Sequence, residues 1–316
     1  MELIRGLNNL ICHRRPCVAT IGNFDGVHLG HQRVIGQLLN LAKQYQLPAT
    51  IMTFDPLPQE YFLGDQAPMR LMPFREKWVE LERLGVDRLF CPSSNHKLAE
   101  CSAERFVHEI LHQGLGIQHL LIGDDFQFGQ DRQGDYALLV QEGQKLGFAV
   151  DRAETFAQQG ERVSSTRIRA LLCAGEIAAA NQLLGRPFTL SGPVSAGLQL
   201  GRQLGVPTAN IRVKTPLSAM SGVYVVAVEI EGERFQGVAN LGFRPTVSAQ
   251  KAGGSSEEAL ELRLETHLFE FNRDLYRRRI RVQLLHKVRE EKKFASLELL
   301  QAAIESDIQQ AKAWFK

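Results

Sequence analysis

The sequence predicts two folds in one chain, an α/β half with a parallel sheet and then a small antiparallel β-barrel that ends in one helix. Strand and helix patterns alternate through the first 185 residues, which is typical of a parallel sheet with helices on both faces. After residue 185, glycine and proline recur every few residues and short alternating segments replace the helical periods. We therefore expect domains at residues 1–185 and 186–316.

In the first half, each predicted strand is a short apolar run, and each predicted helix spaces its apolar residues three or four apart. The predicted strands include CVATI (17–21), LPATIM (47–52) and GFAVDRA (147–153). The predicted helices include residues 34–44, FREKWVELER (74–83), the stretch that follows the helix cap Ser102, and residues 141–146. Strands and helices in this order favour a parallel sheet.

In the second half, the segments alternate like neighbouring strands of an antiparallel sheet. The segment FTLSGPVSAGLQLGRQLGVPTANIRV (188–213) has glycine or proline every few residues and no helical period. The strand patterns lie in GVYVVAVEIEGERFQGVANLGF (222–243), ALELRLETHLF (259–269) and RRRIRVQLLHKV (277–288). The final stretch, SLELLQAAIESDIQQAKAWF (296–315), predicts one amphipathic helix capped by Ser296. Residues 249–259 (AQKAGGSSEEA) read as a polar loop inside this domain.

Composition favours an ordinary soluble globular protein of the cytoplasm. The chain has 316 residues, 44% hydrophobic and 23% charged, and its net charge of +2 gives no reason to expect a nucleic-acid or membrane partner. Five cysteines without a C-x-x-C pair indicate reduced thiols rather than a disulfide framework. The N-terminal stretch lacks the apolar run of a signal peptide, and no segment is long enough to span a membrane.

The segment GNFDGVHLGH (22–31) predicts a phosphate site where the strand CVATI ends and a helix begins. Ligands of parallel sheets bind beyond the carboxyl ends of the strands, and helix N-termini favour anions. Glycines let the backbone approach a ligand, and His28 and His31 can donate hydrogen bonds to a polyphosphate. The spacing matches neither G-x-G-x-x-G nor a Walker A loop. Two alternatives remain, plain helix-start histidines and a zinc site, although zinc would need more ligands nearby.

These residues carry a resemblance. HLGH (28–31) resembles the H-x-G-H signature of adenylyl- and cytidylyltransferases, and GNFDGVHLGH is similar to the N-terminal module of bacterial bifunctional riboflavin kinase/FAD synthetases. TFDP (53–56), IGDDFQFGQDRQGD (122–135) and VSSTRIR (163–169) follow in that family's order. The resemblance implies a Rossmann-like nucleotidyltransferase domain. The residues expected at its ATP phosphates are Gly22, Asn23, Phe24, Gly26, His28, His31, Ser164, Ser165, Thr166 and Arg169.

Two of the motifs also admit plain structural readings. Hydroxyls and arginines at a second helix start suit a polyphosphate, yet Ser164 to Thr166 could equally cap that helix. The resemblance implies that Asp125, Phe126 and Phe128 contact the flavin side of the site. The two phenylalanines fit a hydrophobic core equally well.

The segment GRQLGVPTAN (201–210) predicts a second site, in the barrel half. Thr208 and Asn210 place two neutral oxygens along an extended segment, which suits a magnesium ion that also binds phosphate. SGPVSAG, GVYVV, GVANLGFRPT and LETHLFEF complete an ordered set that resembles riboflavin kinases. The resemblance implies that Gly201 and Thr208 bind ATP, that Thr208 and Asn210 hold Mg²⁺, and that Glu265 is the general base for the riboflavin hydroxyl.

Alternatives accompany this second site, and departures from the family pattern occur in both halves. Glu265 could lie on the solvent face of an alternating strand, and Arg289, which resembles a flavin-binding arginine, could form a surface ion pair. Arg277 stands where the family commonly has glycine, Asp124 is an additional acid, and the loop 249–259 varies within the family. These departures bear on substrate affinity.

We therefore expect a bifunctional enzyme of FAD biosynthesis. The barrel would phosphorylate riboflavin with ATP to give FMN, and the α/β domain would adenylylate FMN with a second ATP to give FAD and pyrophosphate, both with Mg²⁺ and without a covalent intermediate. Riboflavin, FMN and ATP are the expected small-molecule partners. The alternatives are an enzyme that retains one activity and a regulator that binds flavin or nucleotide without turnover.

Overall fold

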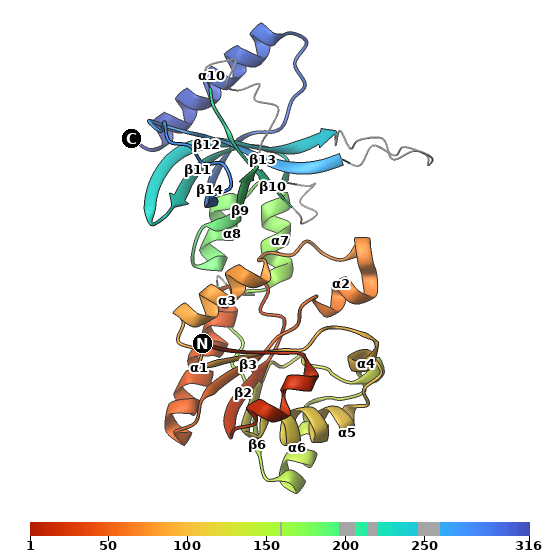
Figure 1. The fold of residues 1–316 in the computed structure, drawn as a ribbon. Coiled ribbons are helices and arrows are strands. Elements are labelled where there is room, and N and C mark those ends of the chain that lie inside the picture. The colour runs from red at the N-terminus through yellow and green to blue at the C-terminus, as the bar shows by residue number, and fades with distance from the viewer. Residues whose placement is uncertain (159, 196–205, 214–219, 246–259) are drawn as a thin grey trace, which may run out of the picture. The chain divides into compact units, whose positions relative to one another are not determined.

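The computed structural model describes residues 1–316 except 159, 196–205, 214–219 and 246–259, and it divides into two compact units. The first unit comprises Met1–Ser165 and the second Thr166–Lys316. Gly201 and the loop 249–259 lie outside the described residues. Figure 1 shows the elements of both units.

The first unit is a six-stranded sheet whose strands are all parallel, as the sequence predicts. The strand order is β1-β4-β3-β2-β5-β6. The strands are β1 (Glu2–Arg5), β2 (Cys17–Ile21), β3 (Ala49–Met52), β4 (Arg88–Cys91), β5 (Ile117–Ile122) and β6 (Ala149–Arg152). The helices are α1 (Leu29–Tyr45), α2 (Pro58–Leu63), α3 (Phe74–Arg83), α4 (His96–Ala99), α5 (Ala103–Arg105), the wider π-type helix η4 (Phe106–Leu115) and α6 (Tyr136–Leu146). Two short strands, β7 (Ala157–Gln158) and β8 (Glu161–Arg162), form a separate hairpin.

Both faces of this sheet are covered, which explains why its strands are apolar runs. Every residue of β2 is buried. Cys17, Ala19 and Ile21 pack in a core with residues of η4 and α6, whereas Val18 packs in a second core with residues of α1 and α3. Successive side chains of a strand point to opposite faces, so β2 separates these two cores.

The order of the strands favours a ligand site at β2 and β5. The chain runs from β2 through β3 to β4 on one side, and from β5 to β6 on the other. In open parallel sheets, ligands bind at such a switch point, outside the carboxyl ends of the two strands. The loop that follows β2, residues 22–28, is therefore where the topology favours a site (Figure 1).

The second unit is a closed antiparallel barrel followed by a helix, which confirms the predicted fold class. The barrel order is β10-β13-β12-β11-β14-β9. The strands are β9 (Phe188–Ser195), β10 (Ala209–Arg212), β11 (Gly222–Ile230), β12 (Glu233–Pro245), β13 (Leu260–Leu268) and β14 (Arg279–Arg289). The helices are α7 (Ser165–Cys173), α8 (Ile177–Leu184) and α10 (Leu297–Trp314), and the Ser296 hydroxyl caps α10 by accepting the N–H of Leu299.

The division between the units lies at Ser165, earlier than the change of sequence texture near residue 185. Asn181 of α8 explains the difference. Its side chain donates to the carbonyl of Leu284 at 2.9 Å and accepts the N–H of Phe188 at 2.7 Å, so α8 is fastened to β14 and β9. The boundary at 185 marks the first barrel strand rather than the first residue of the compact unit.

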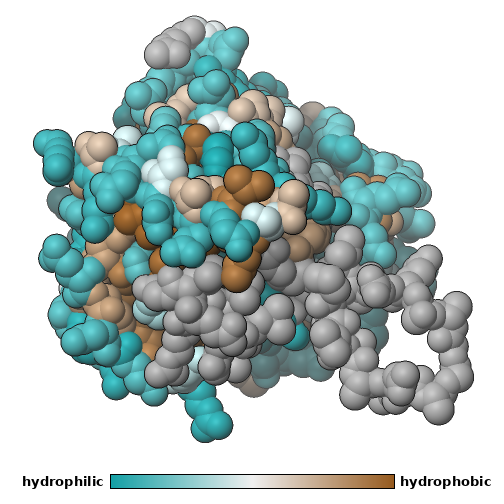
Figure 2. All heavy atoms as spheres, turned by 90° about the horizontal axis from the view of Figure 1, so that it is seen from above, coloured by the Kyte–Doolittle hydropathy of each residue, from teal (hydrophilic) through white to brown (hydrophobic). Residues whose placement is uncertain are grey.

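No helix in the described ranges is long and apolar enough to cross a membrane. In the view of Figure 2, hydrophobic residues lie in small groups between hydrophilic ones. The exposed large hydrophobic residues of α10 are Leu297, Leu299 and Trp314.

Candidate active sites

The first candidate site is the loop 22–28 together with the start of α1. Its conformation is unusual, because Phe24 and Val27 have positive φ values of 46° and 41°, and Gly26 has a φ of 84°. At Gly22, an added Cβ would lie 3.2 Å from the Phe24 ring. The loop ends at His28, the N-cap of α1. The structure therefore gathers the glycines and histidines predicted from this motif at one strand end.

His28 and His31 lie against each other. Their ring centroids are 3.6 Å apart and the rings are nearly parallel. The N–H of His31 donates to the Nδ1 of His28 at 3.2 Å, which caps the helix. Because Nδ1 accepts, the proton of a neutral His28 ring is on Nε2. His28 thus offers an Nε2–H donor, the kind of group that stabilises charge on a phosphate.

The second histidine of the pair is held neutral. Burial, then the charges of His28, Lys77 and Arg162, lower the pKa of His31 well below 6.5. Two positive rings in contact would repel each other, so the pair carries at most one charge near neutral pH. Among the described residues, no group of three or more His, Cys, Asp or Glu side chains is arranged to hold a metal ion.

Gly30 makes room for His28, and this predicts a loss of function in Gly30→Ala. The added Cβ would lie 3.0 Å from the carbonyl oxygen of Val163 and 3.2 Å from the His28 ring. We expect adenylyl transfer to FMN to fall roughly tenfold or more, because small displacements of a positioned group are costly. The measurement is the rate of FAD formation from FMN and ATP.

Gly36→Ala is the matched control on the same helix. An added Cβ there meets nothing within 4 Å. We expect unchanged activity and a gain of about 0.5–1 kcal/mol in the free energy of unfolding, since alanine favours a helix interior. Equal rates in the two variants would contradict the assigned role of Gly30.

The structure brings part of the VSSTRIR motif to the first site. The Ser165 hydroxyl donates to the carbonyl of Asp25 at 2.9 Å, so this serine, the last residue of the first unit, contacts the loop 22–28. Ser164 and Ser165 belong to the first compact unit. Thr166 and Arg169 belong to the second unit, and their contact with ATP phosphates remains a prediction.

The predicted flavin residues after β5 differ in their surroundings. Asp125 accepts a hydrogen bond from Arg162 at 3.1 Å, which lowers the pKa of its carboxyl group. The rings of Phe126 and Phe128 stack with centroids 5.5 Å apart. Phe128 is a core residue, only 6% exposed, whereas Phe126 is partly buried at the edge of that core. Phe126 is therefore the ring of the two that is available to a ligand. The additional acid Asp124 accepts a hydrogen bond from Thr155 at 2.7 Å.

The second candidate site is in the barrel, around Thr208 and Asn210. Both residues line a cavity of about 570 Å³, together with the turn residues Asp274 and Tyr276. Asn210 is 6% exposed, and its Oδ1 atom is buried without a hydrogen-bond partner in the described part of the chain. A buried acceptor of this kind fits a cation, because an unsatisfied oxygen is otherwise costly.

Glu265 lies beside Asn210 in the sheet. In the register of the barrel, Glu265 on β13 is opposite Asn210 on β10 and opposite Asn240 on β12. Paired residues have their side chains on the same face, with Cβ atoms about 4.5–5.5 Å apart. Ser195 on β9 continues the row as the partner of Asn210. The barrel therefore assembles one polar row from four strands.

Two polar residues of this region were not predicted from the sequence. Asn240 lies in GVANLGF and becomes a candidate only through its register with Glu265. Thr266 is fully buried, lines the same cavity as Asn210, and its hydroxyl oxygen has no hydrogen-bond partner within the described ranges. Both residues become candidates only when the neighbouring strands are in place. The sequence of their own segments therefore could not have identified them.

Arg289 forms an ion pair, which is one of the two roles that its sequence suggests. Its guanidinium group binds both carboxylate oxygens of Asp307 on α10, at 2.8 and 2.7 Å, and its Nη1 donates to the carbonyl of Glu290. Asp307 is almost completely buried. Arg289 thus fastens the terminal helix to β14, and its predicted contact with flavin remains a prediction.

Asp307→Asn is expected to lower the free energy of unfolding of the barrel unit on the order of 3 kcal/mol, because it leaves a guanidinium group without its partner. Arg289→Met should have a similar effect, and the double variant should be no less stable than either single variant. Urea unfolding measures all three. If the double variant lost as much free energy of unfolding as the two single variants together, Arg289 and Asp307 would not be directly paired. An unchanged riboflavin KM in Arg289→Met would limit Arg289 to this structural role.

The turn after β13 contains a strained arginine. Arg277 has a φ of 65°, in the left-handed region that favours glycine. Its neighbours Asp274 and Tyr276 line the cavity near Asn210, so the strain lies at the edge of the second site.

Comparisons with known proteins match both halves. A family model described as FAD synthetase matches residues 11–167, and one described as riboflavin kinase matches residues 184–315. A crystal structure described as a macrolide-efflux protein from Streptococcus pneumoniae superposes with a TM-score of 0.79, at 26% identity, over 97% of each chain.

Two curated relatives match along their whole length. The bifunctional riboflavin kinase/FMN adenylyltransferase of Pseudomonas fluorescens is 46% identical, over 99% of this chain and 97% of its own. The protein of the same name from Haemophilus influenzae is 42% identical, over 100% of this chain and 99% of its own. The chain therefore belongs to the family of bifunctional riboflavin kinases/FMN adenylyltransferases.

Proposed function

We propose that the chain carries out two successive reactions, one in each half. The barrel half transfers the γ-phosphoryl group of ATP to the 5′-hydroxyl of riboflavin, which gives FMN and ADP. In the α/β half, the FMN phosphate attacks the α-phosphorus of a second ATP, which gives FAD and pyrophosphate. The observation that carries this proposal is the match of two family models to successive parts of one chain, each with its own fold.

For adenylyl transfer, we assign charge stabilisation to the loop and the histidine pair. The Nε2–H of His28 donates to the phosphate oxygens as charge develops, and the His31 ring, held neutral, supports His28 by stacking. Ser164, just before α7, supplies a hydroxyl donor, and Ser165 holds this segment against the loop by donating its own hydroxyl proton to the Asp25 carbonyl. Positioning both substrates in line suffices for this reaction, so no covalent intermediate is needed.

For phosphoryl transfer, we assign the general base to Glu265, which accepts the proton of the riboflavin hydroxyl as the oxygen attacks. The neighbouring Asn210 and Thr208 would hold a divalent metal ion, which we propose is Mg²⁺. Such an ion supplies positive charge for the phosphate oxygens. Asp274 and Tyr276 line the same cavity and are placed to contact the flavin or nucleotide.

One time course tests the proposal. Riboflavin, excess ATP and a magnesium salt are incubated with the protein, and riboflavin, FMN and FAD are separated by chromatography. We expect FMN to rise and then to give way to FAD. FMN without FAD would indicate an enzyme with the kinase activity alone. No product from either riboflavin or FMN would indicate a flavin-binding regulator.

We also propose that the protein acts in the cytoplasm. The five cysteines are all unpaired, three of them buried, which suits a reducing compartment. Cell fractionation with antibody detection tests the location.

A further inference from the structure

The loop 22–28 is strained, and other residues must hold it in place. Val27 is β-branched and completely buried, yet its φ is 41°, and Phe24 has a similar backbone conformation. A β-branched residue in the left-handed region is a marked outlier, and such conformations persist only where surrounding contacts enforce them. The question is which contacts do so.

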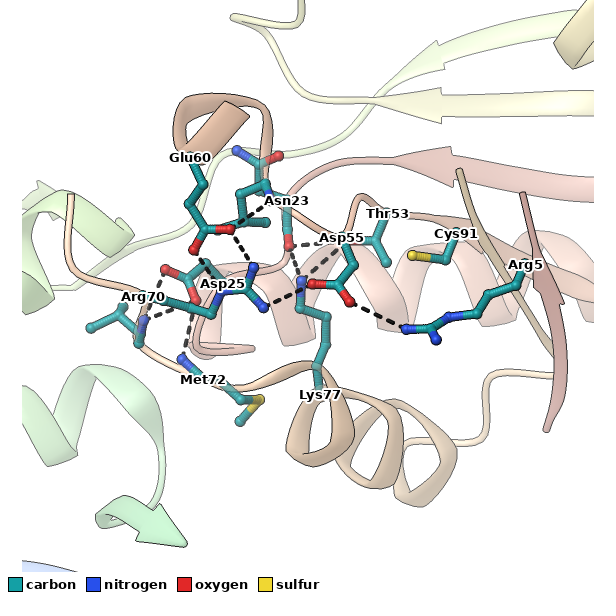
Figure 3. A network of polar contacts seen from close by, with 12 residues as sticks. Arg5, Asn23, Asp25, Thr53, Asp55, Glu60, Arg70, Met72, Lys77 and Cys91 are labelled. Carbon is teal, nitrogen blue, oxygen red and sulfur yellow. Dashed lines mark hydrogen bonds and ion pairs between the residues drawn. The ribbon is translucent and has the colours of Figure 1, made fainter. Parts of the chain in front are cut away.

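Hydrogen bonds reach the backbone and the Asp25 side chain of the loop from several other segments. The carbonyl of Asn23 accepts from the Lys77 ammonium group at 2.7 Å and from the Thr53 hydroxyl at 3.1 Å. The carboxylate of Asp25 accepts the N–H groups of the segment before α3, at 3.0 and 3.2 Å. Two further bonds run from Ser165 Oγ to the carbonyl of Asp25 and from Gln32 Nε2 to the carbonyl of Val27, both at 2.9 Å. Figure 3 shows Lys77 pointing to Asn23 and Thr53 from α3.

Lys77 is the most unusual member of this group, because it is a buried cation. It is 1% exposed, and burial lowers its pKa to about 8, although Asp25 and Asp55 act in the opposite direction. A buried ammonium group is costly unless it is paired and hydrogen-bonded. Its side chain is enclosed, so it cannot touch a substrate in the active site. Any functional effect of Lys77 must therefore pass through the groups that it binds.

The surrounding charges are balanced, which makes this cost tolerable. Arg70 pairs with Asp55 at 3.0 Å and also with Glu60, and Arg5 pairs with Asp55 at 3.2 Å. With Lys77 and Asp25, the charged groups here are the cations Arg5, Arg70 and Lys77 and the carboxylates Asp25, Asp55 and Glu60 (Figure 3). Lys77 also reaches the histidine pair electrostatically, because its charge contributes to the lowered pKa of His31.

We propose that Lys77 is a positioning residue for adenylyl transfer. By binding the carbonyl of Asn23 at the start of the strained loop, it fixes the loop and, through it, His28 at the N-terminus of α1. This inference rests on the function proposed above for the α/β half. The competing explanation is that Lys77 only fills the interior beside α3, in which case an apolar chain of similar length would serve as well.

Lys77→Met tests the inference, because methionine keeps the shape and removes the donors. We expect kcat for FAD formation from FMN and ATP to fall about 100-fold, with the KM for ATP changed less than about threefold. FMN formation from riboflavin, measured on the same sample, should be unchanged. Amide hydrogen exchange of residues 22–28 should become faster. Lys145→Met, which removes an exposed lysine paired with Glu142, is the matched control.

Thr53→Val provides a second test that leaves Lys77 in place. It removes the other donor to the Asn23 carbonyl and keeps the side-chain volume, so we expect a smaller loss of the same kind. Unchanged kcat and KM in both folded variants would overturn the inference, and so would a loss shared equally by the two activities. Failure of the wild-type protein to convert FMN to FAD would instead refute the proposed function itself.

Discussion

Glu265→Gln is expected to lower the rate of FMN formation from riboflavin by about 10²–10⁴-fold. Glutamine keeps the size of the side chain but cannot accept the proton of the attacking hydroxyl. Glu265 is partly buried in the row formed with Asn210 and Asn240, so a neutral amide there should not disturb the barrel. The measurement is the initial rate of FMN formation with saturating ATP and magnesium.

The bifunctional chain supplies its own internal control. FMN added to the Glu265→Gln protein should be converted to FAD at the wild-type rate, because the first site lies in the other unit. Glu229→Gln makes the same replacement at a partly exposed position of β11 and should leave both activities unchanged. FMN formation at the wild-type rate in Glu265→Gln would mean that Glu265 is only a surface residue of its strand.

The fold class could be predicted because local patterns and tertiary environment agree along most of the chain. The strand β2 is apolar at every position since both faces of the sheet are covered, and α1 follows it with a helical period. The strand β1 was not predicted. It has four residues, Glu2 and Arg5 among them, and only one neighbouring strand, so its sequence carries little strand character.

The candidate sites were predictable only in part. His28 and Glu265 belong to motifs that family resemblance picks out. Lys77 reads in the sequence as one more charged residue of an amphipathic helix, and its burial depends on carboxylates contributed by distant segments. Asn240 depends on strand register, which a period of two residues cannot specify by itself.

Arg277 has an unusual backbone conformation that its sequence does not reveal. Its positive φ lies in the region that favours glycine, so the arginine is accommodated there at a cost in backbone conformation. The sequence alone shows the departure and not its cause, because backbone conformation at a turn follows from how β13 and β14 are joined.

His28→Asn is expected to lower the rate of FAD formation from FMN by about 10²–10³-fold, the loss typical of removing one donor to a developing negative charge. Asparagine is among the best N-cap residues, so it can still accept the N–H of His31 and keep the start of α1 intact. What it removes is the Nε2–H at the far side of the ring. The replacement therefore separates the chemical role of His28 from its structural one.

His28→Ala completes this comparison, because alanine removes the cap as well as the donor. We expect it to lose FAD formation to the same extent and, in addition, about 1 kcal/mol of stability in the α/β unit. FMN formation should persist in both variants, since the kinase site is in the barrel. Wild-type FAD formation in His28→Asn with impaired formation in His28→Ala would reduce His28 to a helix cap. The phosphate charge would then have to be stabilised by the loop and the serines alone.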